Sequence, residues 1–182
     1  MLRPNRPVSL HPAALFAAAR RPEATLSLTL LEPGALARGQ HHPAARELVA
    51  DVRHLWNLDI PDDEWVVRFL NLVGSDPDSL SSELIAAAVS LVPVLRRGRP
   101  MWEPELPLAD LKRTSFPKLV VSGGHSAAFD AICDDLADQI GASRMVVAGA
   151  GHEIQFTGPP LNETLRALWR SVSPTRQSSL AG

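Results

Sequence analysis

Three short apolar runs, separated by stretches with helical patterning, constrain the fold of this chain more than any other feature. They are TLSLTLLEPG, FPKLVVSGG and ASRMVVAGAG, at residues 25–34, 116–124 and 142–151. Glycine or proline closes each run, which is typical of short buried strands, the first at about 26–31. Strands that alternate with helices predict an α/β fold with a short parallel sheet flanked by helices.

The stretches between these runs predict helices. Residues 12–21 are rich in alanine, residues 127–141 close on Gly141 as a C-cap, and residues 159–172 begin with two prolines. Between the first and second strands lies a block of further helical segments. These are 43–58, 62–74, a long apolar helix that starts after Asp78 or Ser79 as N-cap and contains Pro93, and 106–113. The order predicts a core from residues 1–34 and 113–175, an inserted helical block at 35–112, and a flexible tail at 176–182.

Polar residues follow each of the three predicted strands. Glu32 follows the first strand, Gly123–Ser126 follow the second, and Gly149–His152 follow the third. The carboxyl ends of parallel strands lie at one edge of a sheet, and functional sites gather there. The sequence therefore predicts that a carboxylate, a hydroxyl and an imidazole meet at this edge.

The overall composition argues against several classes of protein. The net charge of −2 disfavours a nucleic-acid binder. A single cysteine, Cys133, excludes an internal disulfide and a cysteine-based zinc site, and it fits a reducing compartment. The adjacent His41 and His42 have no carboxylate nearby and are interpreted as solvated loop residues. Without a long apolar run or a convincing signal peptide, we expect a cytoplasmic protein without a metal, a cofactor or a membrane partner.

The order strand, helical insertion, strand, helix, strand, Gly-x-Gly-His, helix resembles the C-terminal half of the α/β-hydrolase superfamily. The residues that carry the resemblance are LTLLEPG at 28–34, FPKLVVSGGHSAAFDAICDDLA at 116–137 and VVAGAGHEIQFTGPPLNETL at 146–165. The resemblance implies a partial α/β-hydrolase fold. In it, residues 1–34 and 113–175 form an incomplete core, and residues 35–112 form a helical cap over the site.

The resemblance also assigns roles to the residues at the sheet edge. His152 matches the general base of the family, and Glu32 is placed to orient it. The loop that more often carries the acid offers His125 and Ser126 but no carboxylate, which favours Glu32. Asp130 is the alternative acid, although it falls within the first turn of the predicted helix.

The nucleophile of this family stands on a G-x-S-x-G turn between a strand and a helix. By alignment that position is Ser9, in PVSLHPAALF, where Pro7, His11 and Pro12 replace the expected small residues. Only eight residues precede Ser9, so the chain resembles a truncated member. Ser126 lies in GHSAA, a similar pattern, but it occupies the acid loop and only one strand separates it from His152.

Two functions are compatible with these sequence features. The first is an ester-type hydrolase that acts on a small molecule through Ser9, Glu32 and His152 without a cofactor. The second is a non-catalytic remnant or binding module that self-associates through the unpaired edge of the first strand. Four aromatic residues of the helical block either line an apolar substrate pocket or form its core: Trp56, Trp65, Phe69 and Trp102.

Overall fold

The sheet predicted from the three apolar runs is present in the computed structural model, which describes residues 12–98, 100–103 and 105–172. Its strands are β1 (Leu28–Leu31), β2 (Lys118–Ser122) and β3 (Ser143–Val146), in the order β1-β2-β3. Both pairs are parallel, with Leu30 opposite Val120 and Val121 opposite Met145. Strand β1 begins two residues later than predicted, and the α/β fold class is confirmed.

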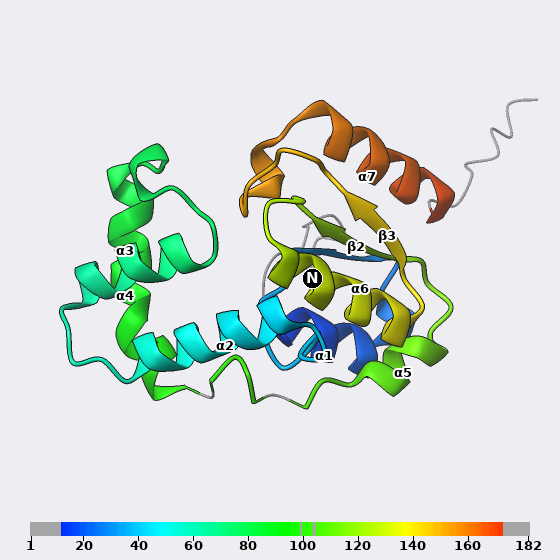
Figure 1. Cartoon of the computed structure of the whole chain (residues 1–182). Coiled ribbons are helices and arrows are strands. Elements are labelled where there is room, and N and C mark those ends of the chain that lie inside the picture. The colour runs from blue at the N-terminus through cyan, green and yellow to red at the C-terminus, as the bar shows by residue number, and fades with distance from the viewer. Residues whose placement is uncertain (1–11, 99, 104, 173–182) are drawn as a thin grey trace, which may run out of the picture.

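Helices cover the two faces of this sheet (Figure 1). Helices α1 (Pro12–Arg20), α5 (Leu108–Arg113) and α6 (Ala127–Ile140) lie on one face, and α7 (Pro159–Val172) lies on the other. Successive strand residues alternate between these faces because side chains along a strand have a period of two. Leu28, Leu30 and Val120 are buried in the cluster with α1 and α6, whereas Leu31, Leu119 and Val121 are buried in the cluster with α7.

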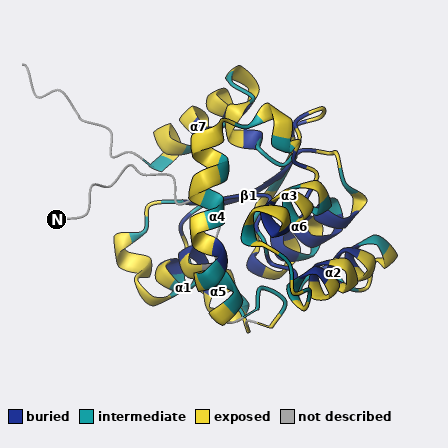
Figure 2. Cartoon of the chain, turned by 90° about the vertical axis from the view of Figure 1, so that its left-hand side faces the viewer, coloured by how far each residue is buried: buried dark blue, intermediate teal, exposed yellow. Residues whose placement is uncertain are grey.

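Within the helical block between β1 and β2, α2 (Pro43–Trp56) packs against the sheet region. The buried face of α2, at Ala45, Leu48, Val49 and Val52, belongs to the same apolar cluster as α6. Helices α3 (Asp62–Leu72) and α4 (Ser82–Arg97) lie beside the sheet and pack on each other (Figure 1). Figure 2 shows the resulting distribution, with buried residues around β1 and α6 and an exposed outer face on α4.

The aromatic residues of this block pack on one another. Trp56 makes edge-to-face contacts with Trp65 and Trp102, at ring-centroid distances of 5.6 and 5.2 Å. Phe69 stacks on Trp65 at 5.1 Å, and Trp65 is fully buried. Aromatic pairs in this geometry stabilise a core. Of the two interpretations left open for these residues, the packing therefore favours the helical core.

The start of α4 differs from the sequence prediction. Pro77–Ser79 form a short 3₁₀ turn, because the Asp76 side chain accepts a hydrogen bond from the Asp78 N–H at 3.1 Å. Helix α4 begins only at Ser82, after Ser81 as N-cap, so the prediction of Asp78 or Ser79 as N-cap is wrong. The C-cap of α6 is confirmed, since Gly141 has a φ of 64° and its N–H bonds to the Asp138 carbonyl.

Cys133 lies on α6 and is fully buried. Burial raises the pKa of its thiol to about 12, so the reactive thiolate is scarce at neutral pH. We therefore expect no reaction with Ellman's reagent in the native protein and one thiol per chain after denaturation in guanidinium. Rapid native labelling would contradict this packing.

No helix in the described part of the chain combines the length and the apolar character needed to cross a membrane.

Candidate functional site

Glu32 lies at the centre of the candidate site. It follows β1 directly, its N–H donates to the Val121 carbonyl at 2.9 Å, and its side chain is fully buried. Its φ of 35° makes it the one non-glycine residue with positive φ in the described part of the chain. Burying a carboxylate and straining its backbone both cost folding free energy. Such strain persists mainly where the surrounding structure imposes it, often at functional sites.

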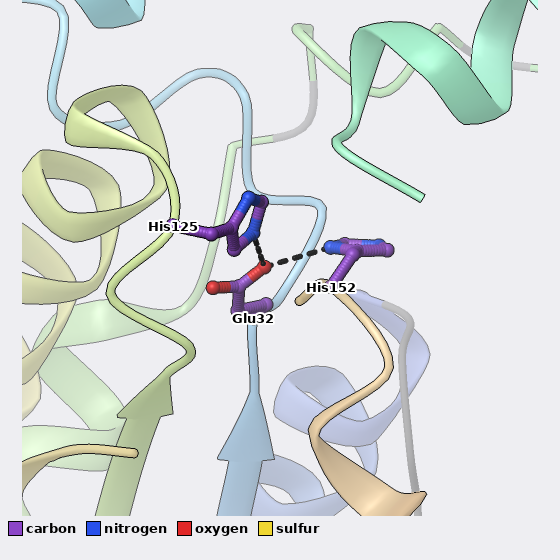
Figure 3. Close-up of side chains that lie close together, drawn as sticks. All are labelled: Glu32, His125 and His152. Atoms are coloured by element: carbon purple, nitrogen blue, oxygen red, sulfur yellow. Dashed lines mark hydrogen bonds and ion pairs between the residues drawn. The ribbon is translucent and has the colours of Figure 1, made fainter. Parts of the chain in front are cut away.

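Three hydrogen bonds compensate the burial of this carboxylate. The Gly123 N–H donates to Oε1 at 2.6 Å, and the rings of His125 and His152 contact Oε2 at 2.8 Å each (Figure 3). Burial raises the pKa of Glu32, but the hydrogen bonds from His152, Gly123 and His125 outweigh it and hold the pKa below the ordinary value. Glu32 is therefore ionised at neutral pH and can only accept, so both imidazole nitrogens that face it carry protons.

The glycine-rich bend before His152 has a specific backbone reason. Residues Val147–Ala150 form a turn that the Ala150 N–H closes on the Val147 carbonyl at 3.0 Å, with Gly149 in its third position at a φ of 79°. That position of a type II turn requires positive φ, which glycine adopts without strain. After the turn, Ile154 is fully buried and fixes the other side of the loop. The bend therefore aims the imidazole of His152 back at β1.

The loops after β2 and β3 touch at Gly123. A Cβ atom there would lie well under 3.0 Å from the backbone carbonyl oxygens of Ala150 and Gly151. Only glycine permits this approach without moving the backbone. Gly123 thus has two roles, since it donates to Glu32 and it lets the His152 loop approach β2.

His125 reaches Glu32 from the loop after β2. Its ring lies against Gly74, where a Cβ would stand 2.5 Å from the ring. Gly74 ends α3 in a Schellman motif, with its N–H on the Asn71 carbonyl and the Ser75 N–H on the Leu70 carbonyl. The turn at the end of α3 therefore packs directly against the ring of His125.

A second contact joins the end of α3 to the His152 loop. The Ser75 hydroxyl is buried and donates to the carboxylate of Glu153, the neighbour of His152. The helical block and the loop after β3 are thus connected directly beside the site.

Phe129 of α6 packs against the imidazole rings of both His125 and His152. Its fully buried ring lies 4.9 Å from the His152 ring and 5.9 Å from the His125 ring, centroid to centroid. The side chains of His125 and His152 are 18% and 17% exposed, so each is mostly enclosed but still partly accessible to solvent. The described residues offer no hydrogen-bond partner to Nε2 of His152.

Two of the other predicted residues, Ser126 and Asp130, hydrogen-bond to groups other than Glu32 and His152. Ser126 is the N-cap of α6, with its Oγ accepting from the Phe129 N–H, and its φ of −141° is extended rather than the strained turn of a nucleophile. Asp130 hydrogen-bonds Ser122 and Arg144, so this alternative acid is not paired with His152. Ser9 lies outside the described residues.

Sequence reasoning placed His125 in the correct loop but missed its contact with Glu32. The signal was available, since a histidine stands two residues after Gly123, at the end of the central strand. The sequence pattern could not show that its ring turns toward β1, because that orientation depends on the packing of Gly74. The role of Gly123 as a donor was missed for a similar reason.

No protein-family model matches this sequence, and no curated protein matches it significantly. Solved structures match in fold. Two come from Mycobacterium tuberculosis, one of them BpoC, described as a non-heme bromoperoxidase. Each is 16% identical, with a TM-score of 0.54 over 92% of this chain, which covers 67% and 68% of their lengths. A third, described as a probable hydrolytic enzyme from Pseudomonas aeruginosa, is 16% identical with a TM-score of 0.52.

These likenesses establish the fold class. The chain has a partial α/β-hydrolase-like fold, as its strand order, parallel register and flanking helices also indicate. It covers 60% of the length of the Pseudomonas structure, with 88% of its own residues aligned. At this level of identity the comparison concerns the fold, and the function is argued from the site.

Proposed function

We propose that this chain is a serine hydrolase that cleaves ester-type bonds in small molecules, with Glu32 and His152 as its orienting acid and general base. One observation supports this most strongly: the buried carboxylate of Glu32 lies 2.8 Å from Nδ1 of His152 at the carboxyl edge of a parallel sheet. A buried acid paired with an imidazole is how serine hydrolases orient their general base. The hydrolase-like fold is consistent with it.

The hydrogen bond to Glu32 sets the tautomer of His152. Because Nδ1 donates to the carboxylate, Nε2 carries the lone pair and faces away from Glu32. In the proposed reaction, Nε2 takes the proton of the nucleophilic hydroxyl while the hydroxyl oxygen bonds to the substrate carbonyl carbon. The same nitrogen then returns the proton to the leaving alcohol. Glu32 remains ionised and stabilises the imidazolium that forms between these steps.

Ser9 is the nucleophile in this proposal. Helix α1 follows it in the sequence and packs on the same face of β1 as α6 does. The role of Ser9 rests on the family resemblance, and Pro7 and Pro12 depart from the expected elbow. Water would complete the cycle by hydrolysing the acyl-serine, with His152 again removing the proton.

We assign the helical block the role of a cap. The turn after α3 supports this, since Gly74 lies on His125 and Ser75 bonds to Glu153. A segment fixed at these two points limits the access of water and substrate to one side of His152. The substrate would then lie between this turn and the sheet edge.

The test is covalent labelling of the full chain with a fluorophosphonate probe, followed by peptide mass spectrometry. We expect the probe on Ser9, with labelling lost in Ser9→Ala and retained in Ser126→Ala. Ser126→Ala is a matched control, since it replaces the serine of the competing GHSAA motif with the same residue. A folded protein without any labelled serine would refute the proposal and favour a non-catalytic binding module.

A further inference from the structure

The proposed hydrolase chemistry needs one histidine, yet the site contains two. His125 Nε2 and His152 Nδ1 lie equally close to the same oxygen of Glu32, at 2.8 Å. In a serine hydrolase site the orienting acid needs the general base alone, so His125 has no part in the proton transfer. A second imidazole on the same carboxylate requires a separate explanation.

The three side chains together match a known set of metal ligands. One nitrogen from each ring and one carboxylate oxygen lie within 4.8 Å of one another. Two histidines and one carboxylate are a ligand set that zinc and similar divalent ions use, with a further position left for water. Each ligand comes from a different strand end, so the sheet itself holds the three side chains together (Figure 3).

The hydrogen bonds around Glu32 leave one oxygen available to an ion. The Gly123 N–H holds Oε1 at 2.6 Å, which orients the carboxylate as outer partners of metal ligands commonly do. Oε2 faces both rings. In the described part of the chain, the ion pairs of Glu32 are with these two histidines, and no lysine or arginine pairs with it.

Two of the three distances between the ligand atoms, those from Glu32 Oε2 to each ring nitrogen, are close to the spacing in a metal site. Bonds of about 2.0–2.1 Å in a tetrahedral site place neighbouring ligand atoms about 3.3 Å apart. The present contacts of 2.8 Å would therefore lengthen by roughly half an ångström. The side chains of His125 and His152 are both partly exposed, which gives an ion access.

We propose that Glu32, His125 and His152 bind a divalent transition-metal ion of the zinc type, and that the bound ion prevents His152 from acting as a base. To coordinate, Nδ1 of His152 must offer its lone pair, so the ring proton moves to Nε2 through solvent. Nε2 then cannot accept the proton of a hydroxyl. One imidazole is thus either base or ligand, so metal binding and proton transfer exclude each other. The loss of base activity on metal binding rests on the function proposed above, whereas the metal site itself does not.

The test uses Co²⁺ as a spectroscopic probe on the full chain after removal of metals with a chelator. We expect one Co²⁺ per chain with visible absorption typical of nitrogen and oxygen ligands, and displacement by Zn²⁺. Zn²⁺ should also raise the Tm, because an ion that binds only the folded state stabilises it. In His125→Asn we expect Co²⁺ affinity to fall at least about tenfold, because losing a direct ligand should cost no less than losing an outer partner of a ligand.

His41→Asn is the matched control, since it makes the same change in the exposed pair His41 and His42. It should leave Co²⁺ binding and the Zn²⁺ effect on Tm unchanged. Absence of Co²⁺ binding to the wild type overturns the proposal, and so does equal binding by wild type and His125→Asn. Measuring Tm in each variant shows whether a loss of binding is only a loss of folding.

The labelling experiment separates this inference from the proposed function. If Zn²⁺ slows fluorophosphonate labelling at the concentration at which it displaces Co²⁺, the result supports the claim that a bound ion prevents His152 from acting as a base. Labelling that is unchanged or faster with Zn²⁺ overturns it. If Co²⁺ binds through His125 but no serine is ever labelled, the metal site stands and the hydrolase function fails.

Discussion

Replacing His152 with alanine is expected to slow fluorophosphonate labelling of Ser9 by about 10²–10⁴-fold, the usual contribution of a positioned general base. The physical reason is that Nε2 of His152 is the group oriented to take the hydroxyl proton. Its partner nitrogen is fixed on Glu32 at 2.8 Å. The measurement is the rate of labelling at fixed probe concentration, with circular dichroism to confirm that the variant is folded.

Glu32→Gln keeps the size of the acid but removes its charge. The amide can donate toward the imidazole and favour the wrong tautomer, a change that costs about 10⁴-fold in a comparable Ser-His-Asp triad. We therefore expect a loss similar to that of His152→Ala, and the double variant should lose little more. His41→Ala is the control and should label at the wild-type rate. If both site variants label at the wild-type rate, the pair has no catalytic role.

The second large effect concerns stability. Gly123→Ala should lower the free energy of unfolding by about 3 kcal/mol, because the new Cβ overlaps the carbonyl oxygens of Ala150 and Gly151. Backbone atoms cannot move aside as a flexible side chain can. For a chain of this length the Tm should fall by about 6–12 °C. The displaced loop carries His152, so labelling should fall as well.

Gly34→Ala is the matched control for this prediction. It makes the same chemical change two residues after Glu32, where a Cβ would meet no atom within 4 Å. Its effect on the free energy of unfolding should stay within about 1 kcal/mol and can be stabilising. The measurement is the free energy of unfolding of both variants by denaturant. Equal stability of Gly123→Ala and the wild type would show that the loops after β2 and β3 do not pack closely.

The sequence sufficed for those parts of the fold that follow from local pattern. Apolar runs closed by glycine predicted the three parallel strands, and Gly141 predicted the end of α6. The start of α4 was mispredicted because two plausible capping serines and two aspartates lie close together there. Asp76 forms a local turn, which leaves Ser81 as the cap. Which candidate caps a helix depends on hydrogen bonds that composition does not reveal.

The candidate site was predictable to the extent that topology determines it. Parallel strands place their carboxyl ends together, so Glu32 and His152 could be expected at one edge. The contact of His125 with Glu32 could not be predicted, because it joins residues 93 positions apart and the ring also packs against Gly74, which is distant in sequence. The positive φ of Glu32 was likewise not predictable, since a non-glycine residue rarely adopts that conformation and no local pattern marks it.

The proposed chemistry requires above all that the ionised carboxylate of Glu32 hold a ring proton of His152. Proton NMR of the full chain, with ¹⁵N-labelled histidine, measures this directly. We predict a slowly exchanging, strongly downfield N–H on Nδ1 of His152 at neutral pH, a second one on Nε2 of His125, and the disappearance of both in Glu32→Gln. Rapid exchange of both ring protons in the folded wild type, or signals that persist unchanged in Glu32→Gln, would show that Glu32 does not hold these protons.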